Sequence, residues 1–121
     1  MTETFLYDTY ALIELLKKNP HYYPYIKSNM VINQFIFAEL CYQLIKNNEK
    51  NMQEYLNEIE PGLIHPSLRV IKEAMKFRYS NKNKNMSMTD CISYMQAKEL
   101  DIKFLTGDKE FEYFDNVEFI K

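Results

Sequence analysis

Glycine is scarce in this sequence, with only 2 in 121 residues, Gly62 and Gly107. Loops of the G-x-G-x-x-G and G-x-x-x-x-G-K-[ST] types need glycine at several fixed positions, because the backbone must approach a phosphate closely. The chain therefore has neither type of glycine-rich phosphate loop.

Cysteine is equally scarce. The 2 cysteines, Cys41 and Cys91, lie far apart in apolar surroundings and form no C-x-x-C pair. This excludes a zinc ribbon and a thioredoxin-like redox site. We expect both to be small buried apolar residues, as is usual for free cysteines in a reducing compartment.

Long apolar runs and a basic leader are also missing. No run approaches the roughly 20 apolar residues that a membrane-spanning helix needs. The opening residues, MTETFLYD, include acidic residues and no basic ones, unlike a secretory signal peptide. We therefore expect a cytoplasmic protein that does not interact with membranes.

The charge has no excess of one sign. Lys and Arg total 15 and Asp and Glu total 17, for a formal charge of -2, and 26% of residues are charged. This composition is typical of a folded globular protein, and the balance differs from that of a strongly basic nucleic-acid-binding protein. The length predicts a single domain over residues 1–121.

Short apolar runs alternate with longer segments of helical periodicity. The predicted strands cover residues 4–7, 30–33, 62–65, 102–106 and 117–120. The predicted helices cover residues 10–18, 21–28, 35–46, 51–60, 67–79 and 88–100, with a turn or short helix over 109–114. This alternation predicts an α/β fold with a central parallel sheet.

Acidic residues lie at or near the ends of several predicted strands. They are Asp8, Glu39, Asp90 and Asp108. Because the sites of parallel sheets form beyond the carboxyl ends of the strands, these side chains could converge on one edge. Carboxylate oxygens suit Mg²⁺ and Mn²⁺, and nucleases use such ions to activate water and stabilise the leaving oxygen.

Each acid also has an ordinary structural interpretation. Asp8 and Asp108 could cap the helix or turn that follows them, and Asp90 fits an S-x-x-D capping box that begins at Ser87. Glu39 could be a solvated residue of a helix face. Capping and metal binding are compatible, so the residues alone leave both interpretations open.

Three segments resemble the PIN-domain family of ribonucleases, in particular its single-domain VapC-type toxins. They are FLYDTYALIELL, FIFAELCYQL and MSMTDCISYMQAKELDIKFLTGDKEF, and the resemblance extends from Phe5 to about Ile120. The last segment is the most specific, with an acidic helix start, an alanine in the helix, a strand and then T-x-D-x-x-F. The family commonly has alanine after the third acid, where this chain has Cys91, a change between two small residues.

The resemblance implies a three-layer α/β/α sandwich and a Mg²⁺- or Mn²⁺-dependent endoribonuclease that uses metal-activated water. It implies that Asp8, Asp90 and Asp108 hold the metal, and that Glu39 joins them or acts through water. Thr106 matches a Ser or Thr that supports the last acid in the family. The resemblance also implies a homodimer and a cognate antitoxin that inserts into the acidic groove.

Basic residues shortly before Asp90 are candidates for RNA contact. They are Arg78, Lys82 and Lys84. They could contact phosphate oxygens, or they could belong to a solvated loop.

The sequence thus predicts a metal-dependent endoribonuclease and the toxin of a toxin–antitoxin pair. The alternatives are a housekeeping RNA-processing nuclease, a DNA-flap nuclease, and a non-catalytic PIN domain that binds RNA or a protein. Loss of an acid would favour the non-catalytic alternative, and all four acids are present. Without those four, the chain has 13 acidic and 15 basic residues. We therefore expect RNA binding to depend on divalent ions as well as on salt.

Overall fold

A parallel sheet of four strands forms the centre of the computed structural model, which describes residues 2–121. The strands are β1 (Thr4–Tyr7), β2 (Asn29–Val31), β3 (Lys103–Thr106) and β4 (Val117–Phe119). They lie in the order β2-β1-β3-β4, and every neighbouring pair is parallel. Leu6 of β1 lies opposite Val31 on one side and Phe104 on the other, which sets the register of the central strands.

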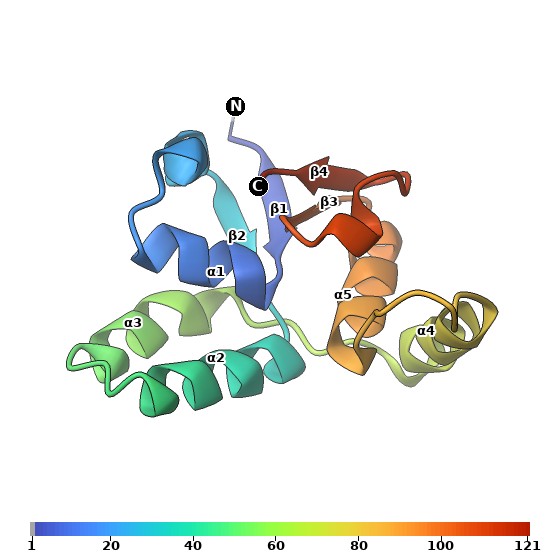
Figure 1. Cartoon of the computed structure of the whole chain (residues 1–121), viewed down its shortest axis with the longest axis horizontal. Coiled ribbons are helices and arrows are strands. Elements are labelled where there is room, and N and C mark those ends of the chain that lie inside the picture. Colours follow the sequence, from blue (N-terminus) through green and yellow to red (C-terminus); the bar gives the residue numbers. More distant parts are fainter. Residues whose placement is uncertain (1) are drawn as a thin grey trace.

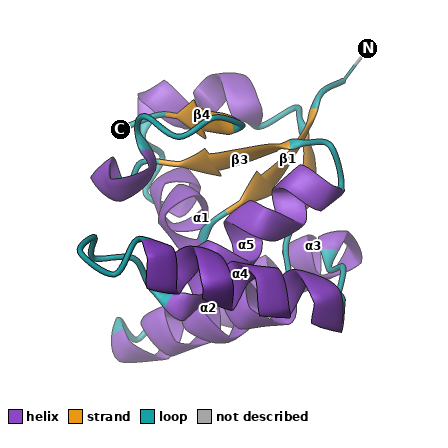
Figure 2. Ribbon diagram, turned by 90° about the vertical axis from the view of Figure 1, so that its right-hand side faces the viewer, coloured by secondary structure: helices purple, strands orange, loops and turns teal. Residues whose placement is uncertain are grey.

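Helices connect the strands and cover both faces of the sheet. The α-helices are α1 (Thr9–Leu16), α2 (Gln34–Lys46), α3 (Met52–Ile59), α4 (Leu68–Ser80) and α5 (Met88–Glu99). The 3₁₀ helices are η1 (Pro20–Tyr25), η2 (Glu60–Gly62) and η3 (Lys109–Phe111). Figure 1 shows α1, α2 and α3 together on one side of the molecule and α5 and α4 on the other. In Figure 2, α5 lies in front of the sheet and α1 behind it.

The direction of the crossovers explains why α1 and α5 lie on opposite faces of the sheet. The chain leaves β1 towards one edge of the sheet and leaves β2 for β3 in the opposite direction. Because parallel crossovers are right-handed, connections in opposite directions lie on opposite faces. A crevice therefore forms at the carboxyl ends of β1 and β3, between the connections that leave these two strands.

The core lies on both faces of the two central strands. Phe5, Leu6 and Tyr7 of β1 are buried, as are Phe104 and Leu105 of β3. Strands that helices cover on both faces are apolar along their whole length, which explains the short apolar runs in the sequence. Aromatic rings of α4, α5, β3 and the segment after it pack together on one face, and they are Phe77, Tyr94, Phe104, Phe111 and Phe114.

A buried polar network joins the start of α2 to α5. The side-chain oxygen of Asn33 accepts from the Ile36 N–H and caps α2, while its amide nitrogen donates to Ser93 Oγ at 3.0 Å and to Gln96 Oε1 at 2.9 Å. Gln96 Nε2 donates in turn to the Ile64 carbonyl at 2.9 Å. The network satisfies polar groups that would be costly to bury unpaired, and it holds together the helices that carry Glu39 and Asp90.

The predicted α/β fold with a central parallel sheet is confirmed, and most predicted elements begin and end within two residues of the observed ones. The short helix predicted over 109–114 ends at Phe111. The helix predicted over 21–28 is the 3₁₀ helix η1, because Pro24 inside it has no N–H to donate.

The strand predicted over 62–65 is wrong. Only Leu63 pairs there, in an isolated bridge to Ile32. Gly62 still belongs to η2, and Pro66, directly after the predicted strand, has no N–H to donate. The segment between them is therefore too short to extend the ladder.

Within residues 2–121, the helices are all too short or too polar to cross a bilayer.

Candidate active site

Three of the predicted acids line one hollow at the carboxyl ends of β1 and β3. Asp8 follows β1, Asp108 follows β3 across Gly107, and Asp90 reaches the hollow from the first turn of α5. The volume of this acidic hollow is about 420 Å³. The hollow lies at the crevice that the sheet topology predicts. Asp8 and Asp108, which are 100 positions apart in the chain, both line it.

Asp8 is the most buried of the three, with a relative exposure of 3%. Its Oδ1 accepts from the Ala11 N–H at 2.9 Å and caps α1, and its Oδ2 accepts from the Thr106 hydroxyl at 2.6 Å. Burial raises the pKa of Asp8 to about 7 against these two hydrogen bonds, and the charges of Asp90 and Asp108 add to the rise. The same carboxylate therefore both caps a helix and faces the hollow.

Asp90 and Asp108 are partly buried and are each held by the start of a helix. The Asp90 N–H donates to Ser87 Oγ at 3.0 Å, which is one half of the predicted capping box. Asp108 Oδ1 accepts from the Glu110 N–H at 3.0 Å at the start of η3. The pKa of Asp90 is raised to about 6, mainly by burial, and the charges of Asp108 and Glu39 contribute to this rise.

Thr106 connects two of the acids. Its buried hydroxyl donates its only proton to Asp8 and accepts from the Asp108 N–H at 3.0 Å. Because each of these bonds uses a different capacity of one oxygen, the hydroxyl can make both at once. This geometry fixes the Asp8 carboxylate relative to the backbone that carries Asp108.

Glu39 lies beside the acidic hollow and lines an adjacent one. Its Oε1 accepts from the Thr9 hydroxyl at 2.7 Å, and its own hollow is formed with Ala38, Tyr42 and Gln43. Its charge still contributes to the raised pKa of Asp90. The structure thus places Glu39 within electrostatic reach of the other acids but at the border of their hollow.

The donor chemistry of the acidic hollow suits a hard divalent cation. Among residues 2–121, no Lys, Arg or His forms an ion pair with Asp8, Asp90 or Asp108, so their charges have no protein counter-ion in direct contact. In the described residues, no three His, Cys, Asp or Glu side chains are close enough together to hold a metal ion as a group. Mg²⁺ commonly takes one or two carboxylates and completes its octahedron with water, so an open set of this kind fits it.

Sequence reasoning missed three other residues that line the acidic hollow. They are Tyr10, Lys109 and Lys121. Lys109 directly follows Asp108, and this proximity could have identified it. Lys121 reaches the hollow only because β4 lies beside β3, which no local pattern indicates.

Gly107 has a packing role at this site. A Cβ atom built on it would lie 2.2 Å from the Tyr10 ring and 2.5 Å from the Ile120 carbonyl oxygen. Any side chain would therefore push apart α1 and the end of β4, which close around the acids.

The basic residues predicted to contact RNA lie together in a separate hollow. Arg78, Lys82 and Lys84 line it where α4 passes into α5. The structure brings these three side chains to one place, next to the segment that leads to Asp90.

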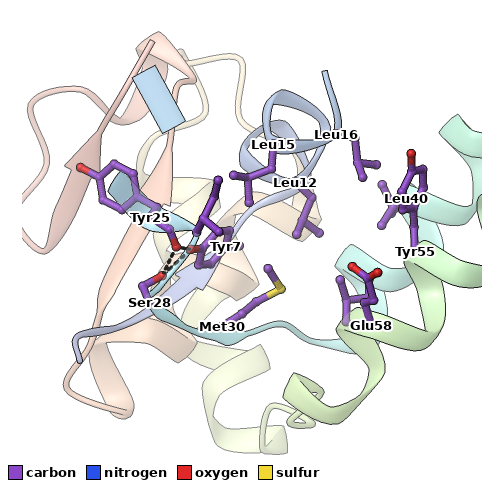
Figure 3. A pocket seen from close by; sticks show the side chains of 12 residues that line it. Tyr7, Leu12, Leu15, Leu16, Tyr25, Ser28, Met30, Leu40, Tyr55 and Glu58 are labelled. Atoms are coloured by element: carbon purple, nitrogen blue, oxygen red, sulfur yellow. Dashed lines mark hydrogen bonds between the residues drawn. The ribbon is translucent and has the colours of Figure 1, made fainter. Parts of the chain in front are cut away.

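A cavity of opposite character lies between α1, η1 and α3, with a volume of about 260 Å³ (Figure 3). Its lining is mainly apolar and includes Leu12, Met30 and Ile59. The Tyr7 hydroxyl lies in the lining of the cavity, where it donates to the Tyr25 carbonyl at 2.7 Å and shares a short hydrogen bond with Ser28 Oγ. None of the four predicted site acids lines this cavity.

Comparison with known proteins identifies relatives at the level of family and fold. The model of the PIN domain family matches residues 5–117. A toxin–antitoxin complex from Klebsiella pneumoniae contains a chain with a TM-score of 0.76 and 17% identity, covering 94% of this chain and 95% of that one. VapBC2 from Rickettsia felis, bound to a promoter DNA fragment, gives a TM-score of 0.73 at 18% identity, and the match covers 97% of this chain and 97% of that one.

DNA-bound VapBC from Salmonella typhimurium gives a TM-score of 0.68 at 17% identity, covering 99% of this chain and 98% of that one. The search of curated proteins finds no match. At these identities the solved structures show a shared fold.

Proposed function

Because the chain belongs to the PIN domain family, we propose that it is a Mg²⁺- or Mn²⁺-dependent endoribonuclease that acts as the toxin of a toxin–antitoxin pair. Proteins of this family are generally nucleases. The observation that carries the proposal is the meeting of Asp8, Asp90 and Asp108 in one hollow without an ion-pair partner. A charge cluster of this kind is unfavourable for folding, and such clusters are typical of functional sites.

In this proposal Asp8, Asp90 and Asp108 hold the divalent ion, and Glu39 acts on it through water. When bound, the ion lowers the pKa of a coordinated water and neutralises charge on the phosphodiester. Thr106 and the Ala11 N–H orient the Asp8 carboxylate, and burial restricts the rotation of this side chain further.

The raised pKa values of Asp8 and Asp90 make metal loading depend on pH. Without a divalent ion, Asp8, with a pKa of about 7, and Asp90, with a pKa of about 6, retain protons well above the usual range of a carboxyl group. Since a carboxyl group must lose its proton to hold a metal, loading releases protons and strengthens as pH rises.

The toxin assignment is supported by the solved structures of similar fold, which include a toxin–antitoxin complex and two VapBC complexes. They match this chain over nearly its whole length and theirs. We propose a homodimer, and a cognate antitoxin that places a cationic segment in the acidic hollow, where it would pair with carboxylates that form no ion pair among residues 2–121.

RNA cleavage by the purified protein tests the proposed activity. End-labelled RNA is incubated with Mn²⁺ or with EDTA, using wild type, Asp8→Asn and Asp90→Asn. Loss of even an indirect support of a metal site costs about 10- to 100-fold, so loss of a ligand should exceed about 100-fold. Asp101→Asn is the matched control, because Asp101 is exposed after α5 and already has the positive φ of 57° that Asn tolerates.

Three results distinguish the possibilities. Cleavage that needs Mn²⁺, fails in both site variants and persists in the control supports the proposal. Equal cleavage by wild type and both site variants contradicts it. RNA binding without cleavage by wild type would identify a non-catalytic binding module instead.

A further inference from the structure

The hollow between the end of α4 and the connection that leads to α5 combines cations with an exposed aromatic ring. Its volume is about 400 Å³. We call it the basic–aromatic cleft, and its lining consists of Met75, Arg78, Tyr79, Lys82, Lys84, Asn85 and Met86. Figure 1 shows the connection that carries its second half, drawn in yellow and light orange, running from the end of α4 to α5.

The three cations of the cleft, Arg78, Lys82 and Lys84, form no ion pair within the described part of the chain. Arg78 Nε donates to the Met86 carbonyl at 3.3 Å, which ties the connection back to α4. The rest of its guanidinium keeps further donors for a ligand.

Aromatic rings hold the two lysines at the cleft. Lys82 Nζ lies 4.6 Å from the centre of the Tyr79 ring, and Lys84 Nζ lies 5.6 Å from the centre of the Phe114 ring. Tyr79 itself is 71% exposed, although it is a large apolar ring at the end of a helix. An exposed ring flanked by unpaired cations is the combination that binds single-stranded nucleic acid, by stacking on bases and attracting phosphates.

The cleft is continuous in the chain with the acidic hollow. Met86 lines the cleft, the next residue, Ser87, accepts the Asp90 N–H, and Asp90 lines the acidic hollow. Met86 and Asp90 are four positions apart, so their Cα atoms lie at most about 14 Å from each other, and one strand of nucleic acid is long enough to span both hollows.

We propose that the basic–aromatic cleft binds single-stranded RNA beside the cleavage site, with one base stacked on Tyr79 and the phosphates held by Arg78, Lys82 and Lys84. The inference rests on the proposed ribonuclease function and narrows its substrate. A duplex keeps its bases stacked on each other, so only an unpaired base can stack on a protein ring. Stacking replaces the weaker contact of Lys82 with the ring and releases its ammonium group for a phosphate.

RNA binding without cleavage tests the proposal. Fluorescence anisotropy of a labelled single-stranded RNA is measured with the full chain carrying Asp90→Asn, in Mg²⁺, so that the RNA stays intact. Adding Tyr79→Ala should weaken binding about 5- to 150-fold, the range for loss of one stacked base. Tyr79→Phe retains the ring and should bind as the parent does.

The lysines are tested through salt dependence. Each phosphate contact on a single strand contributes about 0.7 to the slope of log K against log salt, so Lys82→Ala with Lys84→Ala should lower the slope by about 1.4. Lys72→Ala is the matched control, an exposed lysine of α4 outside the cleft, and should leave the slope unchanged.

The possible results separate this inference from the proposed function. The inference is overturned if Tyr79→Ala and the double lysine variant bind RNA as well as the parent does. If the wild type still cleaves RNA in that case, the proposed function remains intact. The inference is also overturned if these variants lose binding of poly-glutamate but not of RNA, because the cleft would then recognise an acidic protein segment. A wild type that neither binds nor cleaves RNA overturns both.

Discussion

Tyr7 and Asp8 are neighbours in the chain, yet their side chains lie in cavities of opposite character. Tyr7 enters the wall of the apolar cavity, where its hydroxyl is satisfied by hydrogen bonds. Asp8 faces the acidic hollow, where burial and two other carboxylates oppose its charge. The comparison teaches that two adjacent residues of one extended segment can face a region that stabilises the fold and a region whose like charges oppose it.

The difference between the two regions should respond to pH. The pKa of Asp8 is about 7 in the folded protein and 3.8 as its ordinary value. Because the folded pKa is raised, the stability this group contributes is fully present below about pH 4 and is lost as pH rises through about 7. The loss amounts to about 4 kcal/mol for Asp8, at 1.36 kcal/mol for each unit of pKa.

Urea unfolding in EDTA at pH 5 and at pH 8 measures the part of this loss that falls above pH 5, about 2.7 kcal/mol, and Asp8→Asn should remove most of the difference. Asp90, with a pKa raised to about 6, contributes in the same direction. An Asp8→Asn protein with the same pH dependence as wild type would contradict this account of the hollow.

Truncating the apolar cavity should instead lower stability equally at all pH values. Ile59→Ala removes a buried side chain of α3 from the cavity wall and should cost about 3 kcal/mol, within the usual range for such truncations. The same urea experiment at pH 5 and pH 8 checks it. Ile45→Ala, at a position 62% exposed, is the control and should change little. A cost for Ile59→Ala that depended on pH would show that the two regions are coupled.

A divalent cation should stabilise the acidic hollow and not the apolar cavity. At a concentration 100 times its Kd, Mg²⁺ or Mn²⁺ should raise the free energy of unfolding by about 2.7 kcal/mol. Thermal melting with and without Mn²⁺ measures the shift. We expect a larger shift at pH 8 than at pH 5.5, because Asp8 and Asp90 must be ionised.

Two variants make the metal effect specific. Ile59→Ala should keep the full shift despite its lower stability, and Asp8→Asn should lose most of it. An equal shift in wild type and Asp8→Asn would place the cation elsewhere.

The smallest expected effect concerns the hydroxyl of Tyr7. Tyr7→Phe removes the contacts of this hydroxyl with the Tyr25 carbonyl and with Ser28 Oγ, but the Ser28 hydroxyl still donates to that carbonyl at 2.7 Å. The cost should therefore be about 1 kcal/mol, the usual net value of one hydrogen bond. Urea unfolding checks it against Tyr113→Phe, whose ring is 92% exposed and should tolerate the change. A cost of several kcal/mol would mean that the apolar cavity depends on its polar wall.

Local signals in the sequence were sufficient for most of the helices and strands. Asp8 and Ser87 accept from the backbone at the starts of α1 and α5, as their positions before apolar periodic segments predict. Segment 62–65 misled the same reasoning, because its apolar character does not reveal that a single bridge is all that it forms.

The candidate site was predictable in part. The acids that follow strands could be identified because every parallel strand points its carboxyl end to the same edge. The displacement of Glu39 to a neighbouring hollow and the approach of Lys121 depend on how α2 and β4 pack, and no local pattern encodes that packing.

The sequence by itself thus determined the alternation of strands and helices, the caps and the order of the acids along the chain. Only the tertiary structure decided which acids share a hollow, that Thr106 bonds Asp8 across 98 residues, and that Arg78, Lys82 and Lys84 surround an exposed ring. The physical reason is range. Propensity and capping act between residues a few positions apart, whereas the orientation of a side chain in a site depends on contacts between segments that meet only when the sheet has formed.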